Sequence, residues 1–135
     1  MKQNKLTIAV PRACLTNTAL ENLQKIIANK QTLFQRAFQA DSTKVEITEE
    51  KINFAWFSYT EDRDEIAAYT QFISRLCDMA KDAKRISSKP TETDNDKYAF
   101  RCFLLRLGFI GKEYKTARKI LLRNLAGNSA FRYGV

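Results

Sequence analysis

Residues 97–125, KYAFRCFLLRLGFIGKEYKTARKILLRNL, combine a nearly continuous apolar run with many cations. Asp94 or Asn95 can cap a first helix that runs to about Leu107, because short polar side chains satisfy the first free N–H groups of a helix. Glycines at both ends of GFIG, residues 108–111, favour a helix end and a turn. A second helix is then expected up to Leu125, before Gly127. The stretch therefore predicts a C-terminal pair of helices with a short connection.

The two predicted helices differ in how their apolar side chains are distributed. The first is apolar nearly all round, which favours a buried position. On a wheel at about 100° per residue, the second gathers apolar side chains in one arc: Tyr114, Ala117, Leu121 and Leu125. Its opposite side carries Lys112, Lys115, Lys119 and Arg123. We predict that the first helix is the buried partner and that the second presents a cationic face.

The net charge of +8 is concentrated in the same region. Residues 1–96 hold 14 Lys and Arg against 14 Asp and Glu, whereas residues 97–135 hold nine Lys and Arg against one acid, Glu113. A disordered basic tail would contain few leucines and aromatic residues. The C-terminal part is therefore expected to be folded and basic.

Upstream of this region the pattern alternates between strand and helix periods. Residues 6–10 alternate with period two, and Pro11 ends the strand. A helix follows from Thr16 or Asn17 to about Phe38, and residues 29–31 can bend or split it. Period two returns from Lys44 into a hairpin, whose second run directs its apolar side chains to the core: Ile52, Phe54 and Trp56.

A further helix is expected after TEDRDE, residues 60–65, with Thr60 or Asp62 as its cap. The predicted fold is α+β: a small antiparallel sheet, made of a β-strand plus a β-hairpin, packs with helices in the order β-α-β-β-α-α-α and ends in the helical pair. We expect a single domain over 1–135. It would contain an α+β core at 1–86, a linker at 87–95 and the basic helical pair at 96–135.

Composition argues against several functional classes. The chain has no histidine, the commonest general base and zinc ligand, and its three cysteines lack Cys-x-x-Cys spacing. We therefore expect a non-enzymatic protein without cofactor or metal. Carboxylates within residues 61–65 could hold Mg²⁺, but charge compensation at a helix N-terminus explains them better. No apolar run approaches a membrane span and the N-terminus lacks a signal-peptide pattern, so a cytoplasmic location is expected.

A basic helix after a short turn suggests a helix-turn-helix-like, DNA-binding arrangement. Cations would contact phosphates, and a few side chains would reach base edges. The candidate nucleic-acid-binding residues are Lys112, Lys115, Arg118, Lys119, Arg123, Asn124 and Arg132. DNA is favoured over RNA. The alternative for the helix is an ordinary solvated face, and for the tail it is a C-terminus with Phe131 tucked back. An ordinary exposed helix would carry several acids at i,i+4 spacing, whereas this one offers only Glu113, which favours the functional interpretation.

The segment DNDKYAFRCFLLRLGFIGKEYKTARKILLRNLAGNSAFR, with FAWFS and AAYTQFISRLCDMA upstream, resembles a family of small virulence-related proteins carried by bacterial mobile genetic elements. The resemblance implies a setting of conjugative elements and phages. Small proteins in that setting regulate transcription, assist DNA transfer or block host defences. The resemblance implies no catalytic or binding residues.

Two other functions fit the same sequence. The basic face could dock on an acidic protein surface, as in a protein-interaction module that inhibits a host defence nuclease in the manner of anti-CRISPR proteins. A purely structural or self-associating protein is the third alternative. The partner is therefore expected to be nucleic acid or an acidic protein surface.

Overall fold

The computed structural model describes residues 5–83 and 95–126 and shows an α+β fold. The secondary-structure elements, including two short 3₁₀ segments η1 and η2, are β1 Lys5–Pro11, η1 Arg12–Cys14, α1 Asn17–Asn29, α2 Gln31–Phe38, β2 Glu46–Ile47, β3 Lys51–Ser58, α3 Arg63–Asp82, α4 Asp96–Leu107, η2 Lys112–Tyr114 and α5 Lys115–Leu122. The predicted fold class is confirmed. The predicted linker at 87–95 lies outside the described residues except for Asn95.

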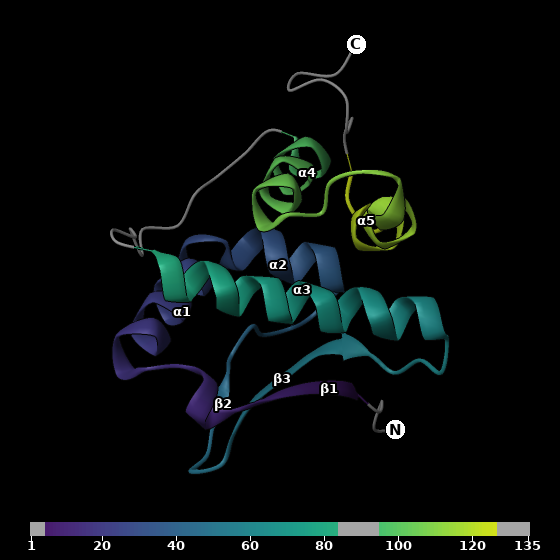
Figure 1. Cartoon of the computed structure of the whole chain (residues 1–135). Helices are drawn as coiled ribbons and strands as arrows, with labels where there is room; N and C mark the ends of the chain where they lie inside the picture. Colours follow the sequence, from purple (N-terminus) through teal and green to yellow (C-terminus); the bar gives the residue numbers. More distant parts are fainter. Residues whose placement is uncertain (1–4, 84–94, 127–135) are drawn as a thin grey trace.

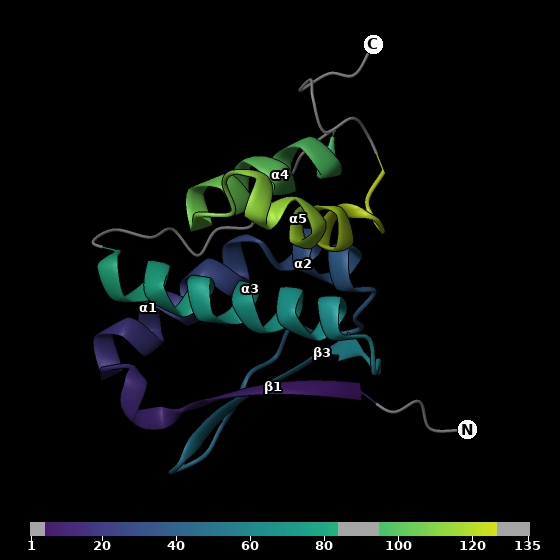
Figure 2. The ribbon, with the colours of Figure 1, turned by 45° about the vertical axis from the view of Figure 1, so that its right-hand side comes forward.

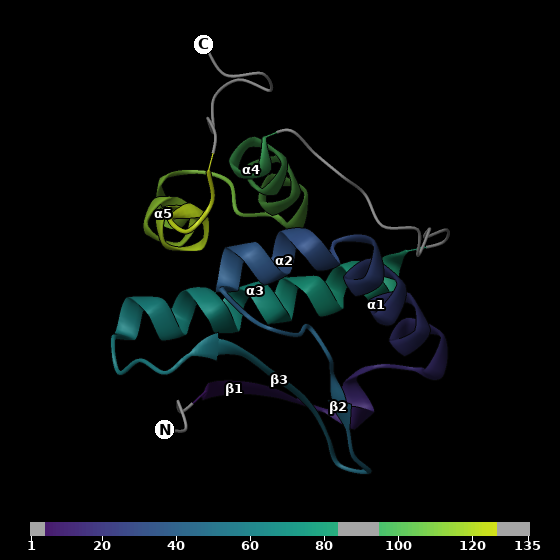
Figure 3. The ribbon, with the colours of Figure 1, turned by 180° about the vertical axis from the view of Figure 1, so that it is seen from behind.

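The elements are arranged in three layers (Figure 1). An antiparallel sheet of strand order β1-β3-β2 forms the first layer. Helices α1, α2 and α3 cover one face of this sheet, and α4 and α5 lie on the far side of α2 and α3 (Figures 1 and 3). The basic helical pair is thus separated from the sheet by a layer of helices.

A bulge in β3 explains why its two final apolar residues are both buried. Leu6 pairs with Phe57 and Ile8 pairs with Phe54, so two residues of β3 oppose Thr7 alone. Such an extra residue shifts the alternation of side chains by one position. Trp56 and Phe57 therefore both face the core, at 1% exposure each. Strict period two predicts Ile52, Phe54 and Trp56 inside, which is confirmed, but leaves Phe57 outside.

The helix expected from residue 17 to about 38 is two helices, which changes the order to β-α-α-β-β-α-α-α. Lys30 leaves helical geometry at the junction, with φ −104° and ψ 13°. Its N–H still donates to the Ile26 carbonyl, and its carbonyl accepts from the Phe34 N–H. The change of direction lets both helices bury their apolar sides, because Leu23 and Ile27 of α1 and Phe34 of α2 all enter one core.

The predicted helix starts are confirmed by side-chain caps. Thr16 Oγ1 accepts from Ala19 N, Asp62 Oδ1 accepts from Glu65 N and Asn95 Oδ1 accepts from Tyr98 N. Each cap satisfies one N–H group of a first helical turn. Asp62, which belongs to the acidic cluster at 61–65, is therefore engaged in starting α3.

Phe34 is the centre of the core. It is fully buried on α2, and five aromatic rings lie with their centroids 5.5–6.3 Å from its own: Phe38 of α2, Trp56 of β3, Phe72 of α3, and Phe100 and Phe103 of α4. This one side chain consequently contacts all three layers.

Replacing Phe34→Ala should lower the free energy of unfolding by about 3–5 kcal/mol, because the cavity left behind is bounded by rings from every layer. Urea unfolding followed by tryptophan fluorescence measures the loss. Tyr59, which is 55% exposed, provides a matched aromatic control as Tyr59→Ala. A similar loss in both variants would contradict the central role of Phe34.

Candidate nucleic-acid interface

The turn between α4 and α5 is a tightly hydrogen-bonded Schellman motif. Phe109 N–H donates to the Leu104 carbonyl at 3.0 Å and Gly108 N–H donates to the Leu105 carbonyl at 3.1 Å. Gly108 has φ +103°, a conformation that favours glycine. An added Cβ would also lie 3.1 Å from Nη1 of Arg75. Phe109 is fully buried and fixes the turn to the core.

The helical pair is an antiparallel hairpin. Lys97 N–H, in the first turn of α4, donates to the carbonyl of Ala126 after α5 at 3.1 Å. Helices that cross at about 90–120°, as in a helix-turn-helix motif, would separate these two ends by about 20 Å, given a rise of about 1.5 Å per residue. Figure 2 shows α4 and α5 side by side above α3. The geometry therefore differs from the crossed pair that places a recognition helix in a groove.

Polar contacts attach the hairpin to α2. Arg36 Nη1 donates to Asp96 Oδ2 at 2.8 Å, at the start of α4. Asn124 Nδ2 donates to the Ala37 carbonyl at 3.0 Å. Asn124, expected to be a candidate for base contacts, therefore bonds to the carbonyl end of α2.

Arg123 forms an ion pair with α3. Its Nη2 lies 2.5 Å from Glu65 Oε2 and donates also to the Tyr69 hydroxyl at 3.3 Å. The Thr60 hydroxyl donates to the other carboxylate oxygen of Glu65. These hydrogen bonds, from Thr60 and then from Arg123, hold the pKa of Glu65 below its ordinary value. The contact joins the end of the hairpin to the first turn of α3.

Arg118 stabilises the turn from within the hairpin. Its Nη1 donates to the carbonyls of Phe109 and Gly111, both at 2.9 Å. Both hydrogen bonds tie the guanidinium to the main chain of one turn and satisfy two of its carbonyls. Arg118, Arg123 and Asn124 each therefore have a role in holding the fold.

Three predicted cations remain on an exposed face, which we call the lysine face: Lys112, Lys115 and Lys119. None of them forms an ion pair with any residue of 5–83 or 95–126. Of the predicted apolar side, Ala117, Leu121 and Leu125 are buried and Tyr114 is half-buried, and Leu122 is buried as well. Arg132 and the rest of the tail lie outside the described residues.

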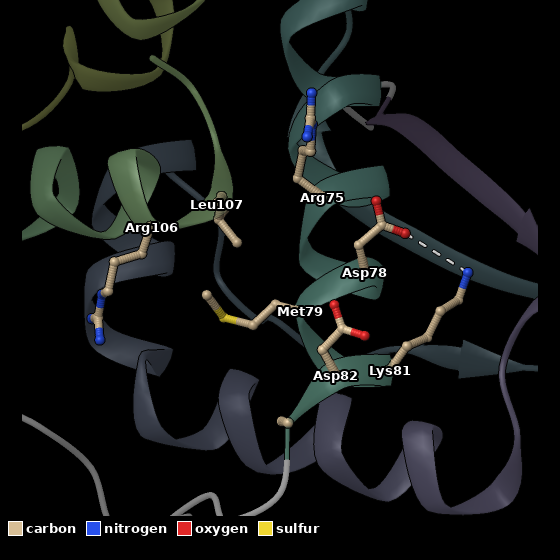
Figure 4. Close-up of a pocket in the computed structure, with 8 residues that line it drawn as sticks. Arg75, Asp78, Met79, Lys81, Asp82, Arg106 and Leu107 are labelled. Carbon is tan, nitrogen blue, oxygen red and sulfur yellow. Dashed lines mark ion pairs between the residues drawn. The ribbon is translucent and has the colours of Figure 1, made fainter.

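A cavity of about 590 Å³ opens beside the hairpin, between the second half of α3 and the end of α4 (Figure 4). Met79 and Leu107 form its apolar part, and Asp78 and Asp82 line the α3 side. Lys81 Nζ lies 3.7 Å from Asp78 Oδ1. Sequence reasoning did not identify this cavity, because its walls come from helices that are distant in the chain.

Other functional groups are either buried or dispersed. Burial raises the pKa of the Cys77 thiol to about 11, so this thiol stays protonated at neutral pH. Within the described ranges, no group of three or more acidic or thiol side chains is placed to hold a metal ion. None of the helices described here is both long and apolar enough to cross a membrane.

Comparison of the chain with protein-family models, with curated proteins and with solved structures finds no match. The resemblance to virulence-related proteins of mobile elements stays an expectation, and the function proposed below rests on residue geometry.

The Glu65 contact predicts a specific dependence of stability on pH. Because its folded pKa is depressed, Glu65 contributes stability that is complete above its ordinary pKa of 4.5 and is lost as pH falls through the folded value. Glu65→Gln should therefore cost about 0.5–1 kcal/mol at neutral pH and flatten the decline of stability in acid.

Urea unfolding at a series of pH values tests this expectation. Glu21→Gln, an exposed substitution on α1, is the matched control. An unchanged acid profile in Glu65→Gln would show that the carboxylate does not fasten α3 to the hairpin.

Proposed function

We propose that the protein binds nucleic acid, with duplex DNA as the favoured partner, through phosphate contacts of the lysine face. The observation that carries this proposal is the set of exposed lysines on η2 and α5, which lack carboxylate partners among the described residues. Exposed helices ordinarily intersperse acids at i,i+4 spacing. A face without them attracts polyanions.

The fixed side chains define the mode of binding. Arg118 and Asn124 would be the natural readers of base edges, but Arg118 Nη1 donates to two carbonyls of the turn at 2.9 Å and Asn124 Nδ2 donates to the Ala37 carbonyl at 3.0 Å, which fixes the direction of both side chains. The lysines that remain suit phosphates, which carry no sequence information. Binding is therefore proposed to be insensitive to base sequence and strongly dependent on salt.

Charge reversal of the lysine face tests the proposal. The triple variant Lys112→Glu, Lys115→Glu and Lys119→Glu should abolish measurable binding at moderate salt, because it removes three phosphate contacts and adds three like charges. Each phosphate contact on B-form DNA contributes about 0.9 to the salt slope, so these three account for about 2.7 of the wild-type slope. Acids near the start of a helix are compatible with folding. Fluorescence anisotropy with a labelled duplex, measured across salt concentrations, gives affinity and slope.

A matched control separates local from total charge. Lys25→Glu, Lys44→Glu and Lys51→Glu change three exposed lysines elsewhere and remove the same net charge. We expect this triple variant to keep a salt slope close to that of the wild type. If the wild type binds neither duplex nor single-stranded DNA at low salt, the proposal fails and an acidic protein surface becomes the better candidate partner.

Glu113 provides a test of opposite sign. It is the one acid after residue 96 and it is exposed between Lys112 and Lys115. Glu113→Gln should tighten DNA binding about two- to fivefold at low salt, because it removes a repulsion of about 1 kcal/mol or less. The gain should fade as salt rises. Glu21→Gln makes the same charge change on α1, and an equal gain there would contradict a local effect of Glu113.

A further inference from the structure

Two cations meet at one aromatic ring on the side of the core opposite to the sheet. Lys30 Nζ lies 5.6 Å from the centroid of the Phe103 ring, and Arg106 Cζ lies 5.8 Å from the same centroid. Lys30 stands at the junction of α1 and α2, and Arg106 is in the last turn of α4. The fold therefore brings together two like charges that are 76 positions apart in the sequence.

No carboxylate balances this pair. Neither Lys30 nor Arg106 forms an ion pair with a residue in the described ranges. Arg106 also lines the cavity that Asp78 and Asp82 line, and Figure 4 shows its side chain extending from α4 away from both carboxylates. Lys30 is half-buried, and burial followed by the charge of Arg106 lowers its pKa. The pair thus carries a repulsion that an anion would relieve.

We propose that Lys30 and Arg106 form a binding site for a phosphate group. A guanidinium offers a planar fork of donors that matches two phosphate oxygens, and a lysine ammonium supplies a point charge to a third. The buried Phe103 ring, at 2% exposure, contacts both cations and holds their positions to the core. Arg106 is exposed, so the pair is open to a ligand from solvent.

A purely structural role makes the opposite prediction for stability. Lys30 at the end of α1 would then stabilise the helix dipole, and both cations would stabilise the fold through the ring. Removal of either charge would lower the melting temperature. If the two cations form a binding site, their repulsion costs stability while the site is empty. Lys30→Met removes this repulsion and keeps the apolar stem, so it should raise the melting temperature by about 2 °C in chloride buffer.

The test compares melting temperatures in sodium phosphate and in sodium chloride at equal ionic strength. Phosphate should stabilise the wild type, because a ligand that binds the native state alone raises its stability. The stabilisation should disappear in Lys30→Met and in Arg106→Met, and persist in Lys25→Met, which alters an exposed lysine of α1. Equal melting of the wild type in both buffers would overturn the site. A lower melting temperature of Lys30→Met in chloride, with the phosphate effect retained, would overturn it as well.

Duplex DNA binding by the same variants identifies the source of the phosphate. A backbone phosphate predicts that Lys30→Met loses about 0.9 of the salt slope, whereas a free phosphate or nucleotide predicts an unchanged slope with the phosphate stabilisation still lost. Both outcomes support the site. The phosphate measurement does not depend on DNA binding, so failure of the nucleic-acid proposal and failure of this site are distinguishable.

Discussion

The packing of rings around Phe34 is the constraint on which the other features of this fold depend. One fully buried side chain of α2 contacts rings from β3, α3 and α4, with centroids 5.5–6.0 Å away. Edge-to-face contacts are directional, so they fix the relative positions of the layers as well as excluding water. Core packing therefore positions the hairpin of α4 and α5 on α2 and α3, and the polar contacts of the hairpin form around this packed interface.

Those polar contacts reduce the number of C-terminal cations that are available to bind a partner. The sequence places nine cations after residue 96, but a cation can bind a partner or hold the fold. Arg123 pairs with Glu65, and Arg118 closes the turn through two carbonyls. The exposed lysines of α5 do neither, and they form a smaller and less specific surface than the full set predicted. The proposed function is accordingly backbone binding without base readout.

In the proposed phosphate site, stability and binding oppose one another at Lys30 and Arg106. Packing Phe103 into the core brings both cations to its ring, and no described carboxylate offsets them. Unbalanced charge near a buried group costs stability unless something outside the chain compensates it. The fold thus holds two kinds of cationic feature: the exposed lysines of η2 and α5, and the pair of half-buried Lys30 and exposed Arg106 at the Phe103 ring.

The sequence by itself determined the α+β class, the helix starts to within two candidate caps each, and the side of β3 that carries Ile52, Phe54 and Trp56, because hydrophobic period and capping chemistry are local properties. The structure selected Thr16, Asp62 and Asn95 as the caps. Tertiary structure decided the break at Lys30, the bulge that buries Phe57, and the fate of Arg118, Arg123 and Asn124. Phe57, Arg123 and Asn124 depend on partners far away in the chain. Arg118 depends on the carbonyls of a turn that the fold must close first, and the break at Lys30 depends on the direction in which a layer must turn to close the core. A helical wheel shows which side of α5 carries charge, but only the packed helices show which of those charges have already found a partner.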